Sequence, residues 1–169
     1  YETENGIQAK ILEITNKIRP EVHDIEQNFE FLAEIDFTRA KAKFAINTKS
    51  IQPEISTKPE IDWSIAIHPL LEKSLKKSGK SVVPLDIKLS SKNRILLISG
   101  PTAGGKSVCL KTVGLLQYML QCGIPIPVAP SSTAGIFRSI FIDIGDEQSL
   151  EDDLSTYSSH LLNMKNMMK

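Results

Sequence analysis

The residues best placed to do chemistry lie in one glycine-rich turn, "GPTAGGKS", at residues 100–107. The turn fits the pattern G-x-x-x-x-G-K-[ST], in which backbone N–H groups curl around a polyphosphate. Glycine is required because a Cβ would block the close approach of phosphate to the backbone. We predict nucleotide contacts from Gly100, Pro101, Thr102, Ala103, Gly104, Gly105, Lys106, Ser107 and Val108.

Lys106 and Ser107 bring the side-chain chemistry to this turn. A lysine here reaches the β- and γ-phosphates as a point charge, which makes Lys106 a candidate catalytic residue, and the Ser107 hydroxyl can hold Mg²⁺. The helix that should follow would aim its N-terminal N–H groups at the same anion. The cofactors expected are therefore ATP and Mg²⁺. A purely structural glycine turn is the competing interpretation, and the apolar runs on both sides disfavour it.

Hydrolysis also needs carboxylates that hold Mg²⁺ through water and polarise the attacking water. One apolar run ends in acidic residues, "SIFIDIGDEQ" at 139–148. Asp143 interrupts that run, so Asp146 and Glu147 depart from the usual arrangement of four apolar residues and then Asp-Glu. One interpretation is that Asp146 and Glu147 are the Walker B carboxylates. The other is that this stretch is a turn whose polar side chains approach the γ-phosphate without supplying the catalytic base.

The elements that must position the turn alternate between extended and helical patterns. "RILLIS" is a continuous apolar run, as a buried parallel strand should be. Strand, turn, helix and strand in this order indicate an α/β fold. We predict strands at 61–69, 82–90, 94–99 and 135–145, a helix at 104–123 that ends on Gly123, and helical spacing again at 149–169. Residues 70–80 form a basic, loosely amphipathic connector, which is either a surface turn or a patch that touches phosphate.

The N-terminal region carries a different pattern. Apolar residues recur at spacings of three and four from Ile7 to Ile35, which predicts an amphipathic helix that Pro20 divides or bends. The stripe packs against a core or forms an intermolecular coiled coil. Thr, Ser, Pro and Lys then accumulate and mark a boundary. We assign 1–48 to a helical segment, 49–60 to a linker and 61–169 to the α/β part.

Composition narrows the functional class. The chain has 169 residues, with 20 Lys+Arg and 20 Asp+Glu, so net charge predicts no general attraction to nucleic acid or membrane. No apolar run approaches membrane-spanning length, and Cys109 and Cys122 have no metal spacing, as expected for buried thiols in a reducing, cytoplasmic compartment. The chain begins at Tyr1 and stops inside a helical pattern, which predicts a piece of a longer protein.

Two quoted stretches resemble a known family. "ISGPTAGGKSVCLKTVGLL" and "FIDIGDEQSLEDDLSTYSSHL" are similar to the ATPase domain of the MutS family, and closer to its second bacterial branch than to the mismatch-recognising one. "DFTRAKAKFA", "HPLL" and "VPLDIKLS" look like the segments that lead into that domain. That branch is linked to suppression of recombination and to action on collided ribosomes.

The resemblance implies a fold and a mode of action. The fold would be the N-terminal half of an ABC-like P-loop NTPase, preceded by a helical appendage from the core or lever domain. Two copies would bury ATP between them as a homodimer, and closure would be coupled to DNA, branched or mismatched, or to the ribosome and its rRNA, through parts outside this chain. The family's Walker B strand and switch histidine would lie beyond Lys169, so we expect negligible ATP hydrolysis from this chain alone.

The resemblance also assigns roles to single residues. Gln148 would lie near Mg²⁺ and the attacking water, as a catalytic residue, and Ser155 and Thr156 would approach the nucleotide of the opposite subunit. Val83, with Val82 beside it, would line the adenine pocket. His68 would approach the adenine or ribose, or would simply cap a turn. Thr102 departs from the family's usual Asn, which puts fine positioning of the γ-phosphate in doubt.

Two rival classes remain on the sequence alone. One is another P-loop enzyme. A transporter-type ATPase would show a "LSGGQ"-like segment, whereas the corresponding place reads "LSTYSSH", and a kinase would need an acceptor-binding lid and a base, which the sequence does not show. A helical interaction module with a purely structural P-loop would instead dimerise through the stripe from Ile7 to Ile35 without nucleotide.

Overall fold

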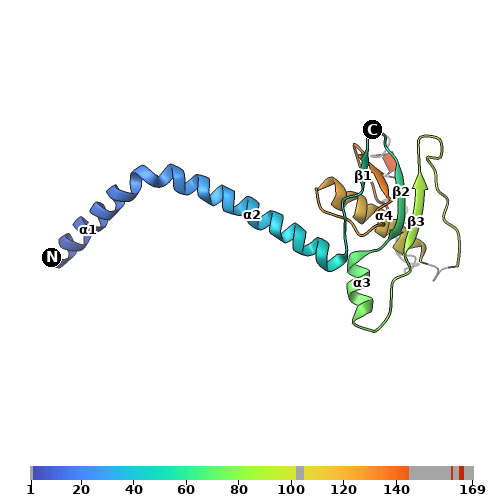
Figure 1. Ribbon diagram of the computed structural model, residues 1–169, viewed down its shortest axis with the longest axis horizontal. Coiled ribbons are helices and arrows are strands. Elements are labelled where there is room, and N and C mark those ends of the chain that lie inside the picture. Colours follow the sequence, from blue (N-terminus) through green and yellow to red (C-terminus); the bar gives the residue numbers. More distant parts are fainter. Residues whose placement is uncertain (1, 102–104, 145–160, 162–163, 166–169) are drawn as a thin grey trace. The chain divides into compact units, whose positions relative to one another are not determined.

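The structure is a computed structural model, and it describes residues 2–101, 105–144, 161, 164 and 165. The chain divides into two compact units, Tyr1–Phe44 and Ala45–Lys169. The first unit is helical, and the second combines helices with a small mixed sheet (Figure 1). This confirms the mixed α/β class with a helical N-terminal region. None of the described helices is long and apolar enough to cross a membrane.

The helices of the first unit are interrupted at the predicted proline. Helix α1 covers Glu2–Ile18, a short 3-10 helix covers Arg19–Glu21, and α2 covers Val22–Thr48. Pro20 lies in the first turn of the short helix, where its missing N–H costs no intrahelical bond. The expected division of the amphipathic pattern at Pro20 is therefore confirmed.

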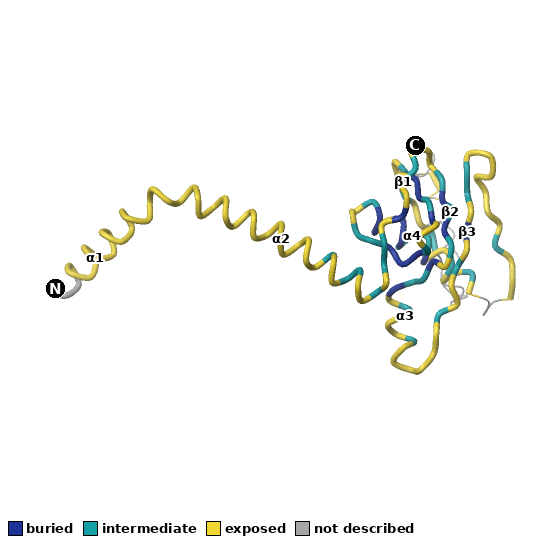
Figure 2. Tube along the Cα trace, in the orientation of Figure 1, coloured by how far each residue is buried: buried dark blue, intermediate teal, exposed yellow. Residues whose placement is uncertain are grey.

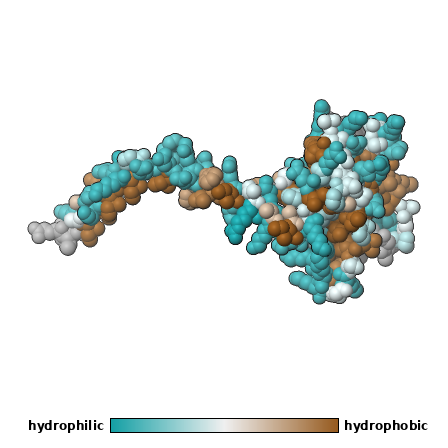
Figure 3. Space-filling model, viewed as in Figure 1, coloured by the Kyte–Doolittle hydropathy of each residue, from teal (hydrophilic) through white to brown (hydrophobic). Residues whose placement is uncertain are grey.

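The apolar stripe of these helices is exposed within the described residues. Its members from Ile7 to Ile35 keep between 44% and 75% of their surface accessible. Figure 2 shows α1 and most of α2 as exposed, and Figure 3 shows apolar side chains along one side of both helices. The amphipathic helix is thus confirmed, whereas the choice between core packing and a coiled coil stays a prediction.

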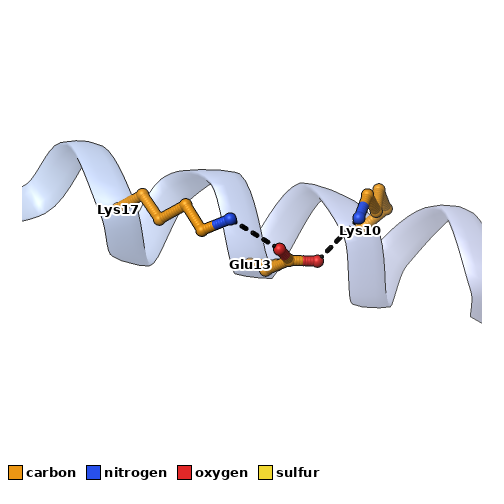
Figure 4. Close-up of polar contacts among 3 residues, drawn as sticks. All are labelled: Lys10, Glu13 and Lys17. Carbon is orange, nitrogen blue, oxygen red and sulfur yellow. Dashed lines mark hydrogen bonds and ion pairs between the residues drawn. The ribbon is translucent and has the colours of Figure 1, made fainter.

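Charged side chains support α1 on its polar face. The Glu13 carboxylate accepts hydrogen bonds from Lys10 Nζ at 2.8 Å and from Lys17 Nζ at 2.7 Å (Figure 4). The two ammonium groups, Lys10 first, lower the pKa of Glu13. Such i,i+3 and i,i+4 pairs contribute only a few tenths of a kcal/mol each (about 0.2–0.5), so they favour the helix without covering its apolar side.

The second unit is organised around a four-stranded sheet of order β1-β4-β2-β3. Strand β1 (Glu54–Ser56) pairs in parallel with β4 (Thr133–Gly135), and β2 (Ile61–Ala66) pairs antiparallel with both β4 and β3 (Leu85–Leu89). The stretch 49–60, expected as a linker, thus contributes a strand to the sheet. Two segments far apart in sequence, β1 and β4, meet because β4 lies between β1 and β2.

Strand β2 ends in an irregular, strained turn. Its register with β3 shifts between Trp63 and Ala66, and Ile65 has a φ of +54°, which is costly for a β-branched residue. The Ile65 N–H is held by Asp86 Oδ1 at 2.7 Å. This bulge turns the chain toward α3 (Pro69–Lys76). Pro69 was expected to end the preceding strand, and a connector was expected after it. The connector at 70–80 was therefore wrong, because Pro69 opens a helix as readily as it ends a strand.

Helix α4 (Lys106–Gln121) packs against this sheet and builds the core. Trp63 is 1% exposed, and Leu116 is fully buried. Figure 2 shows burial concentrated on the sheet and on α4. Gly123 follows the helix with a φ of +70°, which confirms the predicted helix end. The buried apolar residues are Ile61, Trp63, Ala66, Ile87, Leu116, Met119, Leu120, Ile126, Val128 and Ala134.

Two strands predicted from apolar runs are not strands. Residues 94–99 have no regular structure, and Ile95 and Leu97 are 91% and 89% exposed. Of the strand expected at 135–145, Gly135 alone among the described residues belongs to a strand, at the end of β4. A parallel strand buried on both faces needs hydrogen-bonded neighbours and a covering layer on each side. Among the described residues no segment pairs with either run, so composition alone misled the prediction.

Three smaller differences follow the same logic. The strand expected at 82–90 is shortened to β3 because residues before Leu85 find no ladder partner. Cys122, expected to be buried, is exposed at the end of α4, where the helix leaves the core. Most of the helical pattern at 149–169 lies outside the described residues. Within this range Leu161, Met164 and Lys165 are described, and all three are helical.

Candidate functional site

The glycine turn is shaped by a left-handed residue at its end. Gly105 is the N-cap of α4 and has a φ of +81°, which an L side chain adopts only with strain. A Cβ at this position would meet no atom within 4 Å, so backbone conformation rather than space requires the glycine. The turn therefore reverses sharply into α4, as the motif predicts for a loop that wraps an anion.

Lys106 folds back over the turn from the first position of α4. Its Nζ donates to the carbonyl oxygens of Gly100 at 2.7 Å and of Pro101 at 2.8 Å. An ammonium has three donors, so this geometry leaves capacity for a further acceptor at the mouth of the turn. The sequence prediction grouped these residues, and the structure brings Gly100, Pro101 and Lys106 into contact.

The start of α4 offers backbone donors to the same place. The first intrahelical bond of the helix runs from Cys109 N to Gly105 O at 2.9 Å, so the N–H groups of Lys106, Ser107 and Val108 precede that ladder. Ser107 and Val108 are exposed, and no acidic residue lies in the first turn. The first turn of α4 thus places no carboxylate of its own at the positive end of the helix dipole, as suits an anion.

A pocket of about 510 Å³ lies beside the turn. It joins Gly105 and Val108 to Val83 and His68, which come from the segments before β3 and α3. Its volume falls within the usual range of small-molecule sites, about 300–1,000 Å³. The structure thus brings together four residues that the sequence singled out separately. The full lining is Ala66, His68, Leu71, Leu75, Ser81, Val82, Val83, Pro84, Leu85, Gly105, Val108, Cys109 and Thr112.

His68 forms both a helix cap and a wall of this pocket. Its Nδ1 accepts the N–H of Leu71 at 3.3 Å, which is the capped turn that the sequence allowed. Burial lowers the pKa of His68, and the positive charge of Lys111 lowers it further against an opposing backbone hydrogen bond. The imidazole is therefore neutral at pH 7, with its proton on Nε2, because Nδ1 acts as the acceptor.

Cys109 also lines the pocket, and burial raises the pKa of its thiol. A thiol with a raised pKa is a poor nucleophile, so the pocket is suited to binding rather than to covalent chemistry. Within the described ranges, no group of three or more His, Cys, Asp and Glu side chains could hold a metal ion. Ser107 remains the predicted Mg²⁺ ligand, since its hydroxyl lies on the exposed first turn of α4.

Part of the apolar wall of this pocket was not predicted from the sequence. Leu71 and Leu75 form part of its apolar wall from α3, although 70–80 was read as a connector. Their i,i+4 spacing after His68-Pro69 was the signal that could have revealed a short amphipathic helix. Lys111, whose charge acts on His68, was likewise hidden because its neighbour lies far away in sequence.

Several predicted site residues lie outside the described residues. They are Thr102, Ala103 and Gly104 of the turn, Asp146, Glu147 and Gln148 of the acidic stretch, and Ser155 and Thr156 of the interface prediction. Their roles stay predictions.

Comparison with known proteins is consistent with this site. Residues 96–169 match the family model of MutS domain V. The chain is 41% identical over 161 residues to the Endonuclease MutS2 of Leuconostoc mesenteroides, covering 95% of this chain and 19% of the relative. It is also 41% identical over 163 residues to the Endonuclease MutS2 of Carboxydothermus hydrogenoformans, covering 96% and 20%. The chain therefore spans about a fifth of the length of the curated relatives it matches.

Proposed function

Because this chain belongs to the MutS family, we propose that its second unit binds ATP for an ATPase whose dimer closes on the nucleotide and reopens after hydrolysis. The observation that carries the proposal is the position of the Lys106 ammonium. It is held over the carbonyls of Gly100 and Pro101, at the positive end of α4, beside a pocket of about 510 Å³.

The chemistry of each residue follows from its place. Lys106 would neutralise phosphate charge, and the N–H groups of Lys106, Ser107 and Val108 would donate to phosphate oxygens from the helix start. The Ser107 hydroxyl would hold Mg²⁺, which would supply positive charge beside the phosphates. These N–H and ammonium donors fit an anion, since no acidic residue in the first turn of α4 repels it.

The pocket beside the turn offers a place for the adenine base of ATP. Val83 is 88% exposed in the wall, and Leu71 and Leu75 face it from α3. An apolar wall receives the face of a purine ring, while the neutral His68 can donate through Nε2 to the base or ribose. Adenine would then lie between the segment that precedes β3 and the first turns of α4.

Nucleic acid would be handled elsewhere in the assembly. We propose that ATP-driven closure is transmitted through the helical unit to parts that grip branched or mismatched DNA, or the ribosome, in the cytoplasm. The name of the relatives, Endonuclease MutS2, supports an action on nucleic acid by those proteins. This chain contributes the nucleotide-dependent motor, with Gln148, Ser155 and Thr156 completing the site in the closed dimer.

Calorimetric titration of the chain with ATP, with and without Mg²⁺, tests the proposal. We expect saturable binding that Mg²⁺ strengthens and that the K106A variant loses. A folded chain that binds no ATP, or an intact affinity in K106A, would contradict it.

A further inference from the structure

Two glutamines form a chain of side-chain hydrogen bonds on the face of α4 that meets the sheet. Gln117 is 3% exposed, and its Nε2 donates to the carbonyl oxygen of Gly135 at 2.9 Å and to Gln121 Oε1 at 2.9 Å. One turn further on, Gln121 donates from Nε2 to the carbonyl of Phe137 at 3.1 Å and accepts the Phe137 N–H at Oε1 at 2.9 Å. The amide of Gln121 therefore pairs with Phe137 as a neighbouring strand would.

The backbone fixes the orientation of both amides. Phe137 offers one donor and one acceptor, so Gln121 must face it with Oε1 toward the N–H and Nε2 toward the carbonyl. Gln121 Oε1 and the Gly135 carbonyl are then both acceptors, so Gln117 must present its NH₂ group to them. Gln117 Oε1 is left buried without a partner among the described residues, a cost that the two bonds of Nε2 offset.

A second contact joins α4 to the same stretch of chain. Gly114 is buried on α4, and a Cβ built there would come within 2.4 Å of Ile142 Cδ1. Gly114, Gln117, Phe137 and Ile142 share the lining of a cavity of about 420 Å³. The stretch 137–144 thus lies against α4, although its residues form no strand.

We propose that Gln121, oriented by Gln117, is a positioning residue that ties the phosphate-binding helix to the stretch 137–144, which carries Asp143. Helix α4 has 16 residues and spans about 24 Å, and a helix of this length moves as a unit. A shift of its first turn on binding phosphate is therefore carried to the Phe137 backbone. The inference rests on the proposed function, since it needs ATP at the start of α4.

The test compares Gln121→Met with Gln27→Met in the intact chain. Methionine keeps the length of the side chain and removes both bonds to Phe137. Gln27 is a matched control because it is an exposed glutamine of α2 whose amide bonds only its own helix neighbour, His23, among the contacts described. Amide hydrogen exchange is followed by mass spectrometry at 105–109 and at 137–144, with and without Mg-ATP, and ATP affinity is measured in parallel.

In the parent chain and in Q27M, Mg-ATP should slow amide exchange both at 105–109 and at 137–144. The expected slowing is roughly 3- to 10-fold, which is the change that one hydrogen bond in such a network makes to exchange. In Q121M the slowing at 105–109 should remain, with an ATP affinity within a few fold, while the slowing at 137–144 is lost. An equal response at 137–144 in Q121M and the parent overturns the inference. Absence of any ATP effect at 105–109 in the parent overturns the proposed function itself.

Gln121→Glu supplies a second variant if methionine impairs folding. The carboxylate still accepts the Phe137 N–H but cannot donate to the Phe137 carbonyl, so the nucleotide response at 137–144 should fall while that at 105–109 persists. A response in Q121E equal to that of the parent would count against a positioning role for the paired amide.

Discussion

The Nζ of Lys106 lies 2.7 Å from the carbonyl oxygen of Gly100, six residues earlier, and this bond closes the glycine turn on itself. The side chain that would bind phosphate therefore already points at the turn. Its two acceptors are backbone carbonyls, so among the described residues the loop, and no carboxylate, positions the ammonium.

Lys106→Ala should weaken ATP binding strongly with little loss of stability. The bonds it removes are solvent-accessible, whereas a charged hydrogen bond to phosphate contributes about 1.5–3 kcal/mol, so affinity should fall about 10- to 100-fold or more. Titration and thermal unfolding measure the two effects. Lys73→Ala, an exposed lysine of α3, is the matched control and should leave both unchanged. A large fall in melting temperature for K106A alone would point to a structural role instead.

Gly105→Ala should strain the turn, because alanine in the left-handed region costs about 1–2 kcal/mol. We expect a lower urea midpoint together with weaker ATP binding. Gly6→Ala is the opposite control. Gly6 lies inside α1 with no atom within 4 Å of an added Cβ, so alanine should stabilise that helix by about 0.5–1 kcal/mol. Equal stabilities of G105A and the parent would show that the turn relaxes freely.

Gly135→Ala should disrupt the sheet more than either change. A Cβ there would lie 2.0 Å from the Lys58 carbonyl oxygen and 2.6 Å from Glu60 N, and both are backbone atoms that cannot turn aside. Overpacking of this kind costs about 1–3 kcal/mol or more. Chemical unfolding followed by the fluorescence of Trp63 in the core would measure it. A midpoint unchanged by the substitution would place Gly135 further from the backbone of residues 58–60 than described.

Val83→Asp should separate base recognition from phosphate recognition. Val83 lies in the pocket wall but forms no part of the glycine turn, so a carboxylate there should weaken ATP binding by about 10-fold or more through lost apolar contact and added repulsion. Binding of inorganic tripolyphosphate should change much less. Equal losses for both ligands would show that the base lies elsewhere.

His68 should make stability depend on pH. Burial holds its folded pKa below the ordinary value of 6.5, so the unfolded chain binds the proton first. The contribution of neutral His68 to the free energy of unfolding is fully present above pH 6.5 and declines as the pH falls from 6.5 through the folded pKa. A proton on Nδ1 also breaks the hydrogen bond that caps α3 at the Leu71 N–H. Urea unfolding between about pH 7.5 and about pH 5 should show a decline that is smaller in His68→Asn, which can still cap. Parallel curves would exclude His68 as the cause.

Local signals in the sequence determined several features unaided. The G-x-x-x-x-G-K-S spacing predicted a glycine turn that leads into a helix. The structure has such a turn, and its Gly105 is left-handed, a conformation that glycine adopts without strain. Pro20 broke the N-terminal helix for the same kind of reason, through its missing N–H. Helix α4 and its end near Gly123 followed from periodicity and from the C-terminal glycine, which are properties of neighbouring residues.

Tertiary structure decided everything that depends on distant partners. Residues 94–99 look like a strand, but a strand exists only where other segments take up its hydrogen bonds, and none among the described residues does so. The pocket unites His68, Val83 and Gly105 only because the bulge at Ile65 and the packing of α4 on the sheet bring them together. The pairing of Gln121 with Phe137 was equally invisible, since a polar residue on a helix face reveals its partner only once the helix has packed.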